Sequence, residues 1–407
     1  MSIATNTVAP GERWEEFFEL PLITSRDFLL GEVEIMEQCS EWIPGTQSKA
    51  LSLIPIAGPI MVSQIAQQYK LEYERTYENA TEGTRLILDQ CHYKQWNISN
   101  VARGTLYETA KLQGSALGRM APEMLAETLN NGLAVARGTS LLLVRHGKIM
   151  ALHSDAAGGY CPMPISQLIE KTEDALKEFG SVVFRNGYHS NSYTAATWML
   201  PDAKGDLLTM YQDALKSAAS NLHAINFTPA VRFSASDTAR SSAVLKPVFM
   251  KPNGTYIMLG KEISVKHEKS RNGIYGLDLF EQESKTLFAK FKETAEVIEK
   301  MANTEIENPV NCFVGIMNHL NRGATAIPRK YADAAREEVE MYAVSSPIMS
   351  MHDIYLSMSE CVSAARNGGA SKGTVVGIED AIAKVLTLDW KDFDIGGVVA
   401  WGEKGAR

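Results

Sequence analysis

The chain has 407 residues, of which 45% are hydrophobic and 22% charged, a composition typical of a folded globular protein. Forty basic and 48 acidic residues give a net charge of −8, which excludes a protein that coats nucleic acid through bulk positive charge. The longest apolar stretch, residues 50–65, contains prolines and is shorter than the roughly 20 residues of a membrane span, so we expect no membrane partner. Residues 1–17 lack the basic and apolar parts of a secretory signal, and the five cysteines lie far apart, so we expect reduced thiols in a cytoplasm.

Residues 1–137 are predicted to form a mainly helical N-terminal region. Apolar residues recur at near-helical intervals over 60–69, and the pattern continues to about residue 90. A further helix is predicted over 120–136, where Pro122 suits the first helical turn.

Residues 138–275 are predicted to form an α+β core with an antiparallel sheet. In its most strand-like part, Val231, Phe233 and Ala235 alternate with polar residues, which predicts one buried and one solvent-exposed face. The expected elements are a hairpin over 140–152, a helix over 165–179, strands over 181–185 and 193–200 around a polar loop, a short helix over 206–221, and strands over 231–236, 242–250, 255–259 and 262–267, with a turn at Asn253 and Gly254.

Residues 276–407 are predicted to be helical and to pack on this core. A long amphipathic helix is expected over 278–303, followed by helices over 331–342, 351–366 and 378–388. The predicted fold class is therefore α+β, a central antiparallel sheet flanked by helical N-terminal and C-terminal regions.

Motifs for nucleotides, metals and nucleophilic catalysis give little support to an enzyme. The chain has no phosphate-binding loop sequence and no CxxC or HExxH spacing, so we expect no cofactor and no metal. His153, Ser154 and Asp155 are adjacent, and adjacent residues of a strand point to opposite faces. A loop leaving the hairpin explains these three residues better than a catalytic triad.

Asp237 is the carboxylate in the most distinctive setting. It lies between Ser236 and Thr238, after the alternating strand. An aspartate among hydroxyl residues caps turn amides, binds a metal or accepts hydrogen bonds from a ligand, and turn capping is the favoured role.

Basic residues are concentrated between Pro229 and Asn272, where eight face three acidic residues and give +5, leaving −13 for the rest of the chain. On an exposed sheet face, such cations would contact phosphates while aromatic rings stack on bases. The candidate nucleic-acid-binding residues are Arg232, Lys246, Lys251, Tyr256, Lys261, Lys266, His267, Lys269 and Arg271. The alternative is an ordinary sheet surface whose lysines pair with acidic helices.

The order of these motifs resembles the phage/plasmid-like family (domain of unknown function 932) over residues 137–390. The residues that carry the resemblance are Ser236, Asp237 and Thr238, the strand that follows them to Phe249, Asn253 and Gly254, the strand ending at His267, and the Tyr160-Cys161-Pro162 run. Ser236 and Thr238 stand where the family's motif has His and Gly. The resemblance implies a bacterial host cytoplasm and a mobile element, and it brings no established reaction.

Three functional hypotheses follow. The first is a non-enzymatic, oligomeric DNA-metabolism protein that binds or anneals single-stranded DNA through the basic sheet face. The second is a self-assembling structural or interaction protein whose partner is itself, without a nucleic-acid role. The third is an enzyme with a site around Asp237, Ser154 and His267, for which the spacing indicates no reaction type.

Overall fold

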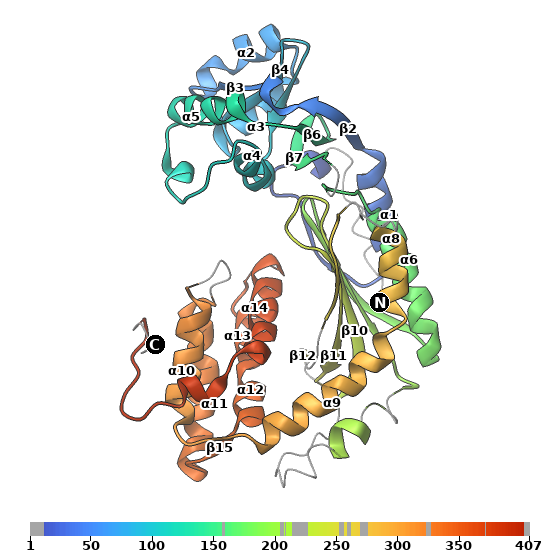
Figure 1. Ribbon diagram of the computed structural model, residues 1–407, viewed down its shortest axis with the longest axis vertical. Helices are drawn as coiled ribbons and strands as arrows, with labels where there is room; N and C mark the ends of the chain where they lie inside the picture. Colours follow the sequence, from blue (N-terminus) through green and yellow to red (C-terminus); the bar gives the residue numbers. More distant parts are fainter. Residues whose placement is uncertain are drawn as a thin grey trace, which may run out of the picture.

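The computed structural model describes residues 12–156, 159–203, 207, 209–213, 227–251, 256–258, 262–268, 276–322, 327–370 and 372–402. The fold is α+β, as the sequence predicted, but it contains two large sheets instead of one. The N-terminal sheet and its helices lie at one end of the molecule, the second sheet lies at the centre, and a helical lobe lies beside it (Figure 1).

The central sheet is antiparallel throughout the described strand pairs. Its strands, in spatial order, are β1 (Glu19–Ile23), β8 (Val183–Ser190), β9 (Tyr193–Met199), β10 (Thr228–Ala235), β11 (Ala243–Met250) and β12 (Tyr256–Met258), with β13 (Ile263–Val265) also pairing with β11.

The N-terminal sheet is antiparallel except where β5 runs parallel to β7. In spatial order it contains β2 (Ser40–Gln47), β6 (Thr139–Arg145), β7 (Lys148–Ser154), β5 (Lys94–Ile98), β4 (Leu86–Gln90) and β3 (Leu51–Pro55). The helices of this end are α2 (Val62–Tyr69), α3 (Tyr73–Thr81), α4 (Arg103–Thr109) and α5 (Pro122–Val135).

The prediction of a mainly helical region over 1–137 is wrong, because β1 to β5 all lie within it. The helical pattern expected to continue to about residue 90 ends earlier, because α3 ends at Thr81 and Leu86–Gln90 form β4, which is buried on both faces. A short apolar run of this kind has no period of its own, so it reads equally well as a continued helix. The helix predicted over 120–136 is confirmed as α5.

One face of the central sheet packs on helices α1 (Arg26–Gln38), α6 (Ile165–Leu176), α8 (Gly276–Ser284) and the first half of α9 (Leu287–Asn303). Val231, Phe233 and Ala235 of β10 are buried in this core together with Phe280 and Phe291, as the alternation predicted. The long predicted helix over 278–303 is divided into α8 and α9. The second half of α9 belongs to the core of the helical lobe, so this helix connects the two (Figure 1).

The other face of the central sheet is covered by the C-terminal helical lobe. Its elements are α10 (Pro309–Leu320), α11 (Arg329–Ser345), α12 (Met351–Met358), α13 (Glu360–Asn367) and α14 (Lys372–Lys384), with the short strands β14 (Glu305–Ile306) and β15 (Met349–Ser350). Ala230 and Val248 of the sheet pack against Ala383 of α14. The prediction that the face carrying Arg232 and Ser234 is solvent-exposed is therefore wrong, because both residues are buried.

The remaining differences concern boundaries. The hairpin predicted over 140–152 is confirmed as β6 and β7, but it belongs to the N-terminal sheet and not to the core predicted over 138–275. The polar loop predicted between 185 and 193 is mostly part of β8. The predicted helix over 206–221 lies mostly outside the described residues, as do Asn253 and Gly254. Among the described residues, the helices are too short or too polar to cross a bilayer.

Candidate functional site

Arg145, at the end of β6, joins the N-terminal sheet to the central sheet. Its side chain is almost fully buried. The guanidinium donates from Nε to Ser40 Oγ at 2.8 Å, from Nη1 to the Asn191 carbonyl at 2.9 Å, and from Nη2 to the Asp237 carboxylate. Asn191 and Asp237 follow strands of the central sheet, so one cation holds the ends of both sheets together.

The turn after β10 is held by Ser236 and not by Asp237, which corrects the favoured sequence reading. Ser236 Oγ accepts hydrogen bonds from the backbone N–H groups of Thr238 at 3.1 Å and Arg240 at 3.2 Å. The Asp237 carboxylate is committed to the guanidinium described above, and its carbonyl accepts from His153 Nε2 at 2.9 Å. Because the acceptor is a carbonyl, Nε2 of His153 carries the proton.

Four aromatic side chains form a stack beside this turn, which we call the ring stack. Tyr160 lies 3.6 Å from His153 and 5.1 Å from His267, measured between ring centroids, and both pairs are nearly parallel. Trp42 of β2 stacks on Tyr160 at 5.6 Å. Main-chain pairing positions the rings, since the Cys161 N–H donates to the His267 carbonyl at 2.9 Å.

The histidines of the ring stack are neutral. Burial lowers the pKa of His267 to about 4, against a smaller opposing effect of Asp237. Burial also lowers the pKa of His153, with its hydrogen bond to Asp237 acting in the opposite direction. Burial raises the pKa of Tyr160 well above its ordinary value. At neutral pH, therefore, the stack offers hydrogen-bonding groups without charge.

A cleft of about 630 Å³ opens beside the ring stack, within the range of ligand-binding sites. We call it the junction cleft, because it lies where the two sheets meet. Its lining residues are Ser48, Glu108, Thr109, Lys111, Arg137, Thr139, Ser140, Leu152, His153, Ser154, Gly159, Tyr160, Ala239, Ser241, Ser242, Lys266, His267 and Glu268. Three of these are exposed cations and many carry hydroxyl groups, so the cleft suits an anionic, hydrogen-bonding ligand.

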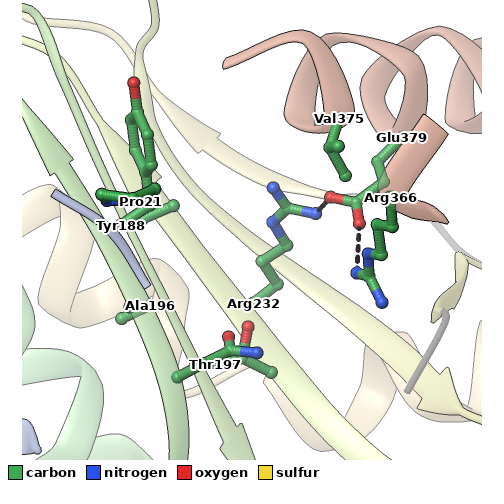
Figure 2. Close-up of a pocket in the computed structure, with 11 residues that line it drawn as sticks. Pro21, Tyr188, Ala196, Thr197, Arg232, Arg366, Val375 and Glu379 are labelled. Carbon is green, nitrogen blue, oxygen red and sulfur yellow. Dashed lines mark hydrogen bonds and ion pairs between the residues drawn. The ribbon is translucent and has the colours of Figure 1, made fainter. Parts of the chain in front are cut away.

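Of the predicted nucleic-acid-binding residues, Arg232 lies in a buried ion pair with Glu379 of α14. Glu379 also accepts from Arg366 Nη2 at 2.9 Å, so one carboxylate lies between two guanidinium groups (Figure 2). Arg232 is only 5% exposed. This arrangement places Arg232 inside the lobe interface, where it cannot contact the phosphate of a nucleic acid.

Lys246 and Lys251 are also paired with the helical lobe. Lys246 Nζ lies 2.8 Å from Asp380 and 3.3 Å from Glu262. Lys251 Nζ contacts Glu360 at 3.7 Å and the Ser359 hydroxyl. The alternative reading of a sheet surface paired with acidic helices is thus confirmed for these lysines, with α13 and α14 as the helices.

Lys266 and His267 are the two predicted residues that the structure places in the junction cleft. The backbone of Tyr256 lies in β12. Outside the described residues lie Lys261, Lys269, Arg271, Asn253 and Gly254. The predicted basic face is therefore not one surface, and its described members divide between the lobe interface and the cleft.

Of the residues proposed for an enzyme, Ser154 and His267 line the junction cleft, whereas Asp237 lies behind its wall, bonded to His153 and Arg145. His153 lies in β7, which runs to Ser154, and not in a loop leaving the hairpin. The sequence reading missed Lys111 and Arg137, which lie far from the basic segment along the chain. Within the described part of the chain, no three metal-ligating side chains form a group.

Comparison with protein-family models gave no match, and searches of curated proteins and of solved structures found no similar chain.

Proposed function

We propose that the chain is a non-enzymatic protein that binds single-stranded DNA in the junction cleft. The observation that carries the proposal is the position of Lys111, Arg137 and Lys266 on a cleft of about 630 Å³ whose wall includes His153, Tyr160 and His267 of the ring stack. Phosphate contacts from exposed cations beside stacked aromatic rings are the usual means of binding single strands.

The charge around the cleft supports an anionic ligand. Lys111 and Arg137 are exposed and form no ion pair among the described residues. Lys266 lies 3.6 Å from Glu268, but both side chains are more than half exposed, so this pair is weak. Glu108 is the other acidic residue of the lining. Three cations thus face two carboxylates, and two of the cations are free to contact phosphates.

The test compares two double variants that change the net charge equally. In Lys111→Glu with Arg137→Glu, we expect affinity for a 12-nucleotide single strand to fall at least tenfold at low salt. The slope of log affinity against log salt should become shallower by about 1.4, since each lost phosphate contact removes about 0.7. Fluorescence anisotropy at several salt concentrations measures both quantities.

The matched control is Lys300→Glu with Arg322→Glu, two exposed cations of α9 and the helical lobe. We expect this variant to keep the wild-type salt slope. Equal losses in both variants would indicate bulk charge and contradict the assignment of the cleft.

The proposal also includes the cellular setting in which the protein acts. The resemblance to the phage/plasmid-like family supports a bacterial cytoplasm in which a mobile element replicates, with annealing of single strands by a homo-oligomer as the role.

Self-assembly without nucleic acid is the second candidate, and one surface favours it. Large apolar side chains are exposed at the end of α11 and just after it, namely Met341, Tyr342, Val344 and Ile348. Exposed apolar groups that lie together are typical of association surfaces. Light scattering on a sizing column, with and without a single strand, distinguishes the two candidates: a large particle that ignores DNA and dissociates in Val344→Glu supports self-assembly.

A further inference from the structure

A second cleft, of about 540 Å³, lies at the turn of the hairpin formed by β6 and β7, and we call it the hairpin cleft. Its walls come from the start of β2, the connection between α2 and α3, strand β5 and the hairpin turn. The junction cleft lies at the other end of β6 and β7, and the two clefts share no lining residue. The volume of the hairpin cleft is within the range of sites for small molecules.

Three cations line the hairpin cleft, namely Lys70, Arg75 and Lys94. Lys70 and Lys94 are exposed, so a ligand in the cleft can reach them. Lys70 forms no ion pair among the described residues. Lys94 Nζ lies 5.2 Å from the ring centroid of Trp96, which is itself part of the wall, so this ammonium group is held at the cleft.

Two carboxylates line the same cleft, and they do not neutralise it. Glu41 lies 3.7 Å from Lys94, but the two side chains are 61% and 47% exposed, so water screens this pair. Glu72 lies 3.0 Å from Arg75 and is 52% exposed. The cations therefore outnumber the carboxylates, and Lys70 keeps its charge for a ligand.

The electrostatic potential at the hairpin turn is positive. The pKa of His146 is lowered to about 4, first by burial and then by the nearby cations Arg75, Arg145, Lys148 and Arg13. A positive potential opposes the uptake of a proton and favours a bound anion. The arrangement of cations therefore suits an anionic ligand at this turn.

The wall of the hairpin cleft favours a small ligand over a nucleic-acid strand. Trp96 is 3% exposed, so its ring offers no face on which a base could stack. Lysine ammonium groups bind phosphates as point charges, and a phosphate group carries more charge than a single carboxylate. We propose that the hairpin cleft binds a small phosphorylated molecule, with Lys70 and Lys94 at its phosphate group. This site is separate from the junction cleft and does not rest on the proposed function.

Cys39 provides a reporter for occupancy of the site, because it is exposed and lines the hairpin cleft. The experiment measures by mass spectrometry how fast iodoacetamide, a neutral reagent, alkylates Cys39 in the full chain as pyrophosphate is added. Because a ligand in the cleft shields the thiol, we expect the rate to fall about tenfold at a pyrophosphate concentration of ten times Kd. Cys91, an exposed thiol outside the cleft, is the internal control and should react at an unchanged rate.

The variant Lys70→Gln with Lys94→Gln tests the assignment of the two cations. We expect its Kd for pyrophosphate, measured also by isothermal titration calorimetry, to rise at least tenfold. The matched control is Lys300→Gln with Lys330→Gln, two exposed lysines of α9 and α11, which should keep the wild-type Kd. Near-ultraviolet circular dichroism confirms that each variant is folded. Should the cleft variant not fold, Lys70→Gln alone replaces it, with an expected rise of about threefold.

Four results would overturn this inference. Equal slowing of Cys39 and Cys91, or equal slowing of Cys39 by potassium chloride at the same ionic strength, would show general screening instead of a site. Unchanged alkylation of Cys39 up to about 10 mM pyrophosphate would show that the cleft does not bind phosphates. A 12-nucleotide single strand that shields Cys39 at lower concentration than pyrophosphate would assign the cleft to nucleic acid. All four leave the junction cleft untouched, since Lys111→Glu with Arg137→Glu tests that site separately.

Discussion

Glu379 is a buried carboxylate at the interface between the central sheet and the helical lobe. Its carboxylate is 3% exposed and contacts both Arg232 and Arg366. Removing one member of a buried ion pair leaves an uncompensated charge, which is far more costly than the pair itself is stabilising. The arginine that the sequence assigned to nucleic acid is thus a structural residue.

We predict that Glu379→Gln lowers the free energy of unfolding by about 3–5 kcal/mol, because it leaves the buried guanidinium of Arg232 and the partly buried one of Arg366 without their carboxylate. Lys266→Ala, on an exposed side chain, should change it by less than about 0.5 kcal/mol. Urea denaturation followed by circular dichroism measures both. A smaller effect for Glu379→Gln than for Lys266→Ala would contradict this account of the interface.

The buried His189 makes the free energy of unfolding depend on pH. The residue is buried in β8, its Nδ1 lies 2.9 Å from Thr194 Oγ1, and burial lowers its pKa to about 3. Because this pKa is below the unfolded value of about 6.5, the unfolded chain takes up a proton as pH falls and the folded chain does not. The contribution of a neutral His189 is complete above pH 6.5 and is lost progressively below it.

Between pH 7 and pH 5 we predict that His189 accounts for a loss of about 2 kcal/mol in the free energy of unfolding. In His189→Asn the same interval should show a loss smaller by that amount, whatever the variant's stability at pH 7. Urea titrations at both pH values give the difference. Identical pH dependence in the two proteins would show that His189 does not titrate on unfolding.

At the scale of elements, the sequence predicted the segments with a clear period and missed those whose burial depends on distant partners. Helix α6 and strand β11 match their expected positions within a few residues. The alternation in β10 correctly identified the face of Phe233, but it also implied that Arg232 meets water. Local pattern contains no information about α14, which lies almost 150 residues further along the chain and supplies the covering carboxylates.

The candidate site shows the same division. The sequence singled out Lys266 and His267, which line the junction cleft, and Asp237, whose carbonyl accepts a hydrogen bond from His153 on the cleft wall. Lys111 and Arg137 belong to the N-terminal end and reach the cleft only because the two sheets meet there. Their contribution depends on the angle between sheets, which no spacing in the sequence encodes.

At Gly132, α5 packs closely against the end of α4. A Cβ at this position would lie 2.4 Å from the Ala110 carbonyl oxygen, at the end of α4. Helix propensity alone favours alanine by about 1 kcal/mol, but the backbone contact outweighs it. We predict that Gly132→Ala lowers the melting temperature by several degrees.

The matched control is Gly31→Ala in α1, where nothing lies within 4 Å of the added Cβ. This variant should raise the free energy of unfolding by about 0.5–1 kcal/mol. Differential scanning fluorimetry measures the melting temperature of both variants. A higher melting temperature for Gly132→Ala would contradict the close approach of α4 and α5.

At the scale of the molecule, the N-terminal sheet and the central sheet have separate hydrophobic cores. Leu88, Leu129 and Leu142 belong to the first core, whereas Leu168 and Phe233 belong to the second. Arg145 is the buried cation that crosses from one to the other. Cooperative unfolding of the two parts therefore depends on the contacts of Arg145 and on the ring stack, which also crosses between them.

We predict that Arg145→Met separates the unfolding of the two sheets. In wild type, calorimetry should show the N-terminal and central sheets melting in one transition, and in the variant a second, lower transition should appear. The ratio of van't Hoff to calorimetric enthalpy, taken over that transition, measures the change. A single transition in Arg145→Met would mean that apolar contacts couple the sheets.

Asp237 serves both halves of the molecule with different atoms of one residue. Its carboxylate holds Arg145 and thereby the sheets, while its carbonyl orients His153 and thereby the wall of the cleft. Saturation mutagenesis should therefore find this position intolerant to change whatever ligand the cleft takes. A loss of function in an Asp237 variant is by itself no sign of catalysis, since the scaffold and the cleft fail together.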